Sequence, residues 1–79
     1  MSEEDAITLD AAEQKKPLKV VSIGGGAKLT KRLESLGIVP GKTVKICSRL
    51  SLGGPLILKV GSTSLTMGRG MAKKIKVSQ

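Results

Sequence analysis

The chain has 79 residues, enough for one domain. A domain of this size buries only about 60% of its unfolded surface, so we expect no deep catalytic cavity. It has no Phe, Tyr, Trp or His and a single Cys, which excludes a disulfide framework, a thiolate cluster and aromatic stacking platforms. The net charge is +8, and from residue 17 onward twelve Lys and Arg stand against Glu34 alone, a net +11 for the body of the domain. Such a field speeds encounter with acidic proteins, nucleic acid or anionic lipid without selecting among them.

The N-terminal stretch divides at about residue 6. Residues 1–6 are polar and acidic and predict a disordered tail, followed by a single domain over residues 7–79. Between Ile7 and Lys16 two interpretations stay open. Ile7 and Leu9 could cap one end of the domain, or residues 8–13 could form a short helical turn.

A strand followed by a helix is predicted next. The run LKVVSI at residues 18–23 is short and β-branched, and three glycines at residues 24–26 close it, which is typical of a strand ending in a turn. Apolar Leu29, Leu33 and Leu36 then recur at helical spacing, which predicts a short amphipathic helix over residues 27–36. Gly37 ends it.

The second half of the chain alternates apolar and polar residues with the period of a strand. Val39-Pro40-Gly41-Lys42 predicts a type II turn, because Pro fixes a negative φ and Gly accepts a positive one. Strands are then expected over residues 43–48, 56–60, 65–67 and 75–77, with turns at residues 53–55 and 61–63. The order β, α, β, β, β, β predicts a mainly β fold: a small antiparallel β-barrel with one short helix inserted after the first strand.

The residue types that carry catalysis are scarce. From residue 17 onward the chain offers one carboxylate, Glu34, and one thiol, Cys47, so neither a metal site nor a general acid and base pair can be assembled there. The glycines at residues 24–26 precede a helix but lack the Gly-Lys-Ser/Thr ending of a phosphate-binding loop. We therefore expect no enzyme, no cofactor and no metal site, and a structural role for Cys47.

The basic residues are the candidates for contact with a partner. Lys28, Lys31 and Arg32 are gathered on one patch by helical spacing, and Arg49 and Arg69 lie beside predicted turns. The other lysines of the strands, such as Lys45, Lys59, Lys74 and Lys76, are interpreted as solvated strand exteriors.

Two segments of the sequence resemble the FeoA family of small ferrous iron transport proteins. They are GGGAKLTKRLESLGIVPGKTVKI at residues 24–46 and LGGPLILKVGSTSLTMGRGMAKKIKV at residues 52–77. The resemblance rests on the order and spacing of a glycine turn, a basic helix, a Val-Pro-Gly turn, a Leu-Gly-Gly-Pro hairpin and the closing Met-Ala stretch. The glycines within residues 67–71 depart from the family pattern, and we expect them to loosen the last turn.

The resemblance implies an SH3-like barrel that resides in the bacterial cytoplasm and serves iron uptake. Its implied partner is the membrane protein FeoB, which it would contact through FeoB's GTP-binding domain or its membrane portion. Carried over to this chain, the interaction surface is the patch of Lys28, Lys31 and Arg32 together with the loop Leu52-Gly53-Gly54-Pro55. The family as a whole is associated with transition metal ions, but the resemblance identifies no residue of this chain as a metal ligand. Contact with an anionic membrane and self-association are further expectations. The alternative from a different class is a basic nucleic-acid-binding barrel that contacts RNA or DNA backbones.

Overall fold

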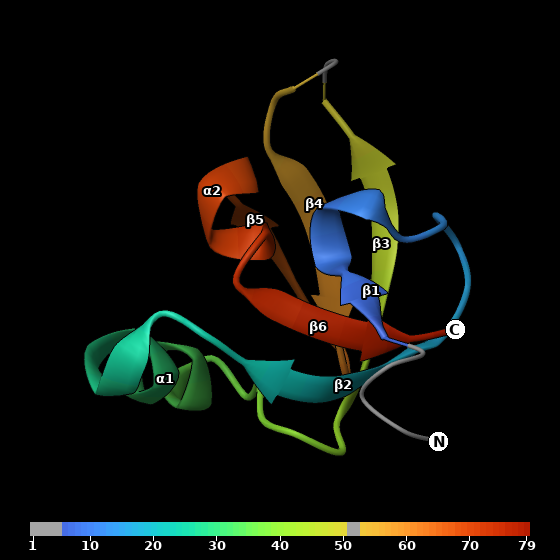
Figure 1. Ribbon diagram of the computed structural model, residues 1–79. Helices are drawn as coiled ribbons and strands as arrows, with labels where there is room; N and C mark the ends of the chain where they lie inside the picture. The colour runs from blue at the N-terminus through green and yellow to red at the C-terminus, as the bar shows by residue number, and fades with distance from the viewer. Residues whose placement is uncertain (1–5, 51–52) are drawn as a thin grey trace.

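The computed structural model describes residues 6–50 and 53–79. Their helices and strands, in chain order, are β1 (Ile7–Thr8), the 3₁₀ turn η2 (Leu9–Ala11), β2 (Leu18–Ile23), α1 (Gly26–Ser35), β3 (Thr43–Arg49), β4 (Leu56–Val60), β5 (Thr63–Met67), α2 (Arg69–Ala72) and β6 (Ile75–Ser78). The six strands form one sheet in the order β1-β6-β2-β3-β4-β5, and every neighbouring pair is antiparallel. The sheet curls around the core, and α1 lies beside one end of it (Figure 1). The expectation of a mainly β, SH3-like fold with one inserted helix is confirmed, and α1 follows the second strand in chain order because β1 precedes the strand at residues 18–23.

Irregularities in two strand pairs allow the sheet to bend. The register between β2 and β6 shifts between Val20 and Ser22, and that between β3 and β4 shifts between Ile46 and Ser48. Bulges of this kind bend a strand and increase its twist. The two ends of the sheet, β1 and β5, meet through the contact of η2 with α2 rather than through a strand ladder.

The core is aliphatic, as the absence of aromatic residues requires. Leu18, Leu33, Ile46, Leu58 and Ile75 are completely buried in it. Every strand except β1 contributes buried side chains, and α1 contributes Leu33. All the residues of the core cluster are apolar, so burial of apolar area stabilises the fold.

The sequence places the central elements within one or two residues. The strand over residues 18–23 is confirmed with the same bounds, and the predicted helix begins and ends one residue earlier than expected. The type II turn is confirmed by a φ of 92° at Gly41 and a hydrogen bond of 3.0 Å from Lys42 N to Val39 O.

Three short elements differ from the expectations. Between Ile7 and Lys16 the short helical turn is found as a 3₁₀ turn from Leu9 to Ala11, and Ile7 and Thr8 form a strand paired with β6 that neither interpretation contained. The glycine-containing stretch near the end was expected to be a loosened turn, whereas it forms α2. Packing explains this helix, because Ala72 is fully buried and Met71 packs against the core. The predicted disordered tail lies outside the described residues except for Ala6.

Gly25 and Gly70 predict opposite responses to the same substitution. Gly25 precedes α1 with a φ of 92°, and a Cβ there would lie 2.6 Å from Leu29 Cδ2. We expect Gly25→Ala to lower the free energy of unfolding by about 1–3 kcal/mol, since the left-handed backbone is strained for alanine and Leu29 must move. Gly70 lies in α2 with open space around its Cβ position, so Gly70→Ala should raise stability by up to about 1 kcal/mol. Urea denaturation followed by circular dichroism measures both, and equal effects of the two changes would contradict this explanation.

Candidate partner-binding surface

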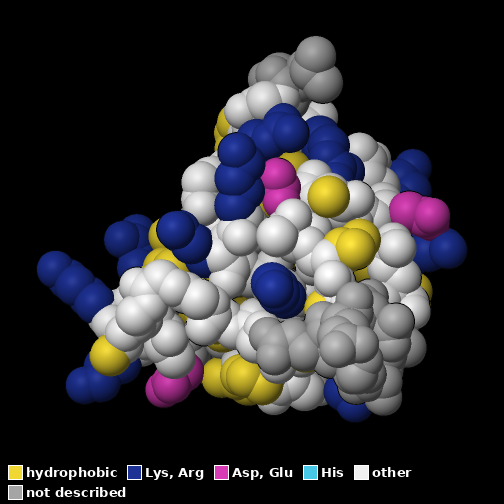
Figure 2. Space-filling model, viewed as in Figure 1, with side chains coloured by type: hydrophobic (Ala, Val, Ile, Leu, Met, Phe, Trp, Pro, Cys, Tyr) yellow, Lys and Arg dark blue, Asp and Glu magenta, His cyan; other side chains and the backbone are white. Residues whose placement is uncertain are grey.

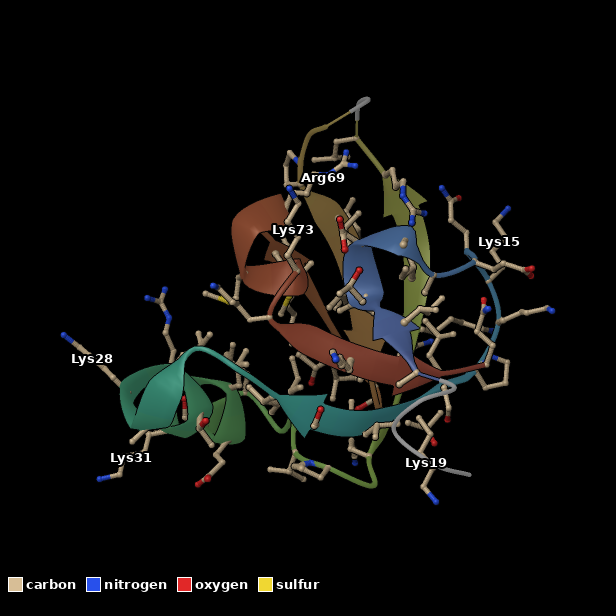
Figure 3. All side chains as sticks on the ribbon, in the orientation of Figure 1. Lys15, Lys19, Lys28, Lys31, Arg69 and Lys73 are labelled. Atoms are coloured by element: carbon tan, nitrogen blue, oxygen red, sulfur yellow. The ribbon has the colours of Figure 1, made fainter. Side chains whose placement is uncertain are left out.

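The basic residues predicted on the helix lie where a partner can reach them. Lys28, Lys31 and Arg32 are all exposed on α1. Lys28 and Lys31 extend outward from the helix, away from the sheet (Figure 3). Leu33 is buried on the opposite side and anchors α1 to the core. The amphipathic pattern therefore orients the helix so that its charged side faces solvent.

A shallow depression with an apolar floor lies within this basic patch. Its lining is Gly25, Lys28, Leu29 and Arg32. Leu29 is half-buried and packs against the core, and Lys28 and Arg32 lie four residues apart, on one side of the helix. An apolar floor bordered by cations suits an acidic protein surface that also carries an apolar side chain.

The structure adds a lysine from the end of the chain to this patch. A second depression is lined by Gly24, Gly25 and the side chains of Lys73, Lys74 and Lys76, with Ser22 and Ile23. Gly25 borders both depressions, and the Cγ atom of Lys74 lies 3.6 Å from the Cβ position at Gly25. We call Lys28, Lys31, Arg32 and Lys74 the basic helix surface, whereas the side chain of Lys73 extends toward Arg69 (Figure 3). Sequence patterns missed Lys74 because the loop after α2 is brought to α1 by the fold, through a hydrogen bond from Gly24 N to Lys74 O.

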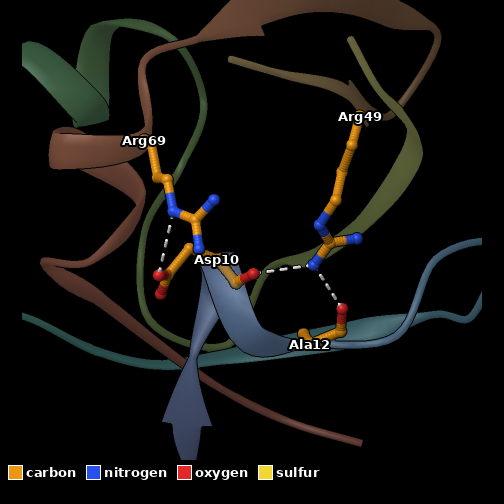
Figure 4. Close-up of polar contacts among 4 residues, drawn as sticks. All are labelled: Asp10, Ala12, Arg49 and Arg69. Atoms are coloured by element: carbon orange, nitrogen blue, oxygen red, sulfur yellow. Dashed lines mark hydrogen bonds and ion pairs between the residues drawn. The ribbon is translucent and has the colours of Figure 1, made fainter. Parts of the chain in front are cut away.

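Arg49 and Arg69, the other predicted contact residues, make contacts within the chain. The Nη2 atom of Arg49 donates hydrogen bonds to the backbone oxygens of Asp10, at 2.7 Å, and of Ala12, at 2.8 Å. Arg69 Nε lies 3.7 Å from Asp10 Oδ2. Asp10 thus lies between the two arginines and joins η2 to β3 and α2 (Figure 4). Its Oδ1 atom is buried and has no hydrogen-bond partner among the described residues.

The hairpin loop lies beside this arginine pair and not beside the helix. A Cβ at Gly53 would lie 3.7 Å from Arg69 Nη1, and Gly54 is half-buried next to it. Figure 1 places the β3–β4 hairpin and α1 at different ends of the molecule, and Figure 2 shows two separate groups of basic side chains, one around α1 and one below the hairpin. The helix and the loop, which were expected to form one interaction surface, therefore lie in two separate regions of the molecule. Leu52 lies outside the described residues, while neighbouring Leu50 is 56% exposed.

The contacts of Arg49 predict a structural role for this residue. Arg49→Ala should lower the free energy of unfolding by about 1–3 kcal/mol, because two half-buried carbonyl groups of the N-terminal segment lose their donor. Arg32→Ala, which removes the same charge from an exposed position, is the matched control and should change stability by less than about 0.5 kcal/mol. Chemical denaturation compares the two, and equal losses would show that the carbonyl contacts contribute nothing.

The described residues contain no candidate metal site and no candidate membrane-spanning helix. No group of three or more His, Cys, Asp or Glu among residues 6–50 and 53–79 is placed to hold a metal. In the same part of the chain, no helix has the length and apolar character needed to cross a membrane.

The fold and the exposed basic helix define a class: small SH3-like modules that carry a helix inserted between two strands. Residues 7–79 match the FeoA domain model, and the chain belongs to the FeoA family. Members of this family are small accessory domains associated with ferrous iron transport.

Solved structures agree with this assignment. A crystal structure of the iron uptake regulatory protein FeoA has 29% identity and a TM-score of 0.81, with 91% of this chain and 93% of that chain covered. An NMR structure of a FeoA-like protein from Clostridium acetobutylicum has 29% identity and a TM-score of 0.84, covering 99% and 88%. ScaR with bound Zn²⁺ is similar in fold, with a TM-score of 0.86 at 22% identity, and this chain covers 39% of it. No curated protein sequence matches the chain.

Proposed function

We propose that this chain is a non-enzymatic accessory protein of bacterial ferrous iron uptake that acts in the cytoplasm and binds the cytoplasmic side of FeoB through the basic helix surface. Membership of the FeoA family supports a role in ferrous iron uptake. The basic helix surface supports the mode of binding, because it combines exposed cations with the half-buried side chain of Leu29.

One observation carries the choice of this surface over the arginine pair. The guanidinium groups of Arg49 and Arg69 are engaged by Asp10 and by backbone oxygens of the same chain. The side chains of Lys28, Lys31 and Arg32 project into solvent from α1, which itself is anchored by Leu33. Among the described residues Lys28, Lys31 and Arg32 make no ion pair, so they give up no internal contact when an acidic partner binds.

Calorimetric titration of the protein with the cytosolic GTP-binding domain of FeoB tests the proposal. We expect saturable binding with one site, an affinity that falls as salt rises, and no comparable binding to an unrelated RNA hairpin. Binding to the RNA alone, with a steep dependence on salt, would instead identify a nucleic-acid-binding module. Absence of binding to both would overturn binding to this domain, and repeating the titration with full-length FeoB in detergent would then test its membrane portion.

A further inference from the structure

The strand β5 forms an edge of the sheet. It pairs with β4 over five residue pairs, from Val60 with Thr63 to Leu56 with Met67, and in the described part of the chain no strand is hydrogen-bonded to its other side. Figure 1 shows β5 at the margin of the sheet, behind α2. An edge of this kind presents unpaired backbone groups to any extended segment that approaches it.

The backbone groups available on this edge belong to Ser64 and Thr66. Val60 and Thr63 flank the two-residue turn at Gly61 and Ser62, and such a turn closes on a hydrogen-bonded pair. Alternation along the strand then directs the N–H and C=O groups of Thr63, Leu65 and Met67 toward β4, and those of Ser64 and Thr66 outward. Both Ser64 and Thr66 are exposed.

The protections that a charge, a proline or a bulge gives an edge strand are missing from β5. Its sequence TSLTM contains no charged residue and no proline, and its register with β4 is regular along its whole length. Natural edge strands commonly carry a lysine, a proline or a bulge that prevents another strand from pairing with them. Neither the sequence of β5 nor its register therefore opposes strand addition, although α2 lies in front of the strand (Figure 1).

A row of like charges leads to this edge across the outer face of the sheet. Lys45 on β3 lies directly opposite Lys59 on β4, and Lys59 lies opposite Ser64. Like charges directly opposite one another are destabilising, and none of the strands β2 to β5 contains an acidic residue to offset them. Both lysines are exposed, and both border one surface depression with Lys42.

An added strand would place one of its side chains in the same row. Residues paired across strands share a face, so a residue opposite Ser64 would lie on the outer face, about 10 Å from Lys59 between Cα atoms. The side chains of a lysine and a glutamate together span that separation. An acidic residue at this position would offset the charges of Lys59 and Lys45.

We propose that the edge of β5 binds an extended acidic segment of a partner protein as an additional strand. The backbone groups of Ser64 and Thr66 pair with the segment, and Lys59 and Lys45 select acidic side chains on the outer face. This surface is separate from the basic helix surface and does not depend on binding to FeoB.

An NMR titration of the labelled protein with a capped peptide of alternating Glu and Val tests this. Amide shifts and slowed hydrogen exchange are expected at Ser64 and Thr66. The same peptide with Lys in place of Glu should bind at least about fivefold more weakly, as should the Lys59→Gln variant with the acidic peptide. Lys31→Gln on α1 is the matched control and should leave the affinity unchanged, because Lys31 extends from the helix away from the sheet (Figure 3).

Two changes test the backbone pairing itself. Thr66→Pro removes an outward N–H without touching the ladder to β4 and should abolish binding. N-methylation of alternate peptide amides should do the same and leaves the protein unaltered. The proposal is overturned by no response at β5 with peptide at about 1 mM, or by equal affinity for the lysine peptide. Shifts at Ser64 and Thr66 that appear on raising the protein concentration without peptide would assign the edge to a second copy of the chain and would also overturn it.

Discussion

Replacing Lys28, Lys31 and Arg32 together by Glu is expected to weaken binding to the cytosolic domain of FeoB by at least about 100-fold. Each replacement converts an attraction to an acidic partner into a repulsion, and like charges brought together at an interface cost several kcal/mol, where about 1.4 kcal/mol corresponds to a factor of ten. The three residues are exposed, so the substitutions should not disturb the core. Calorimetric titration at two salt concentrations measures the change.

The matched control changes the same amount of charge elsewhere. Lys15, Lys16 and Lys19 are also exposed, and Lys15 and Lys19 lie across the molecule from Lys28 and Lys31 (Figure 3). Their replacement by Glu should reduce the affinity by less than about tenfold, through the weaker net field alone. If the two triple variants lost affinity equally, binding would depend on total charge and not on the helix.

Leu58→Ala is expected to lower the free energy of unfolding by about 2–5 kcal/mol. The side chain of Leu58 is completely buried in β4, a strand that is paired on both sides. Its truncation leaves a cavity, and the core has no aromatic side chain that could shift to fill it. A domain of this length has about 4–12 kcal/mol of total stability, so the variant loses much of it.

Leu36→Ala is the control for the core prediction. This leucine is 42% exposed beyond the end of α1, and its truncation should cost less than about 1 kcal/mol. Both proteins must be followed by far-ultraviolet circular dichroism, since a chain without Trp, Tyr or Phe offers no intrinsic fluorescence. Equal midpoints of urea denaturation for the two variants would contradict the core described above.

The longer strands and α1 can be predicted from local patterns in the sequence. Residues 18–23 combine β-branched side chains with a glycine stop, and Leu29 and Leu33 recur at helical spacing. By contrast, β1 has two residues and exists because Ile7 and Thr8 pair with β6, which lies at the far end of the sequence. The helix α2 contains Gly70, a poor helix former, and depends on the burial of Ala72. Neither element leaves a periodic signal in the sequence.

The candidate contact residues also differ in how far the local sequence predicts them. Lys28, Lys31 and Arg32 were predicted together because one helix carries them. Arg49 was predicted as a contact residue because it lies beside a turn, but its guanidinium group reaches carbonyls 37 and 39 residues earlier in the chain. No local pattern indicates such a contact. Lys74 was missed as part of the basic helix surface for a related reason, since only the folded chain brings it beside Gly25.

The proposed binding of FeoB by the basic helix surface is tested by an NMR titration of the labelled protein with the cytosolic GTP-binding domain of FeoB at physiological salt. Amide shifts confined to α1 and the loop carrying Lys73 and Lys74 are the predicted result. Shifts confined to the β3–β4 hairpin and the residues around Arg49 and Arg69, with α1 unperturbed, would contradict it.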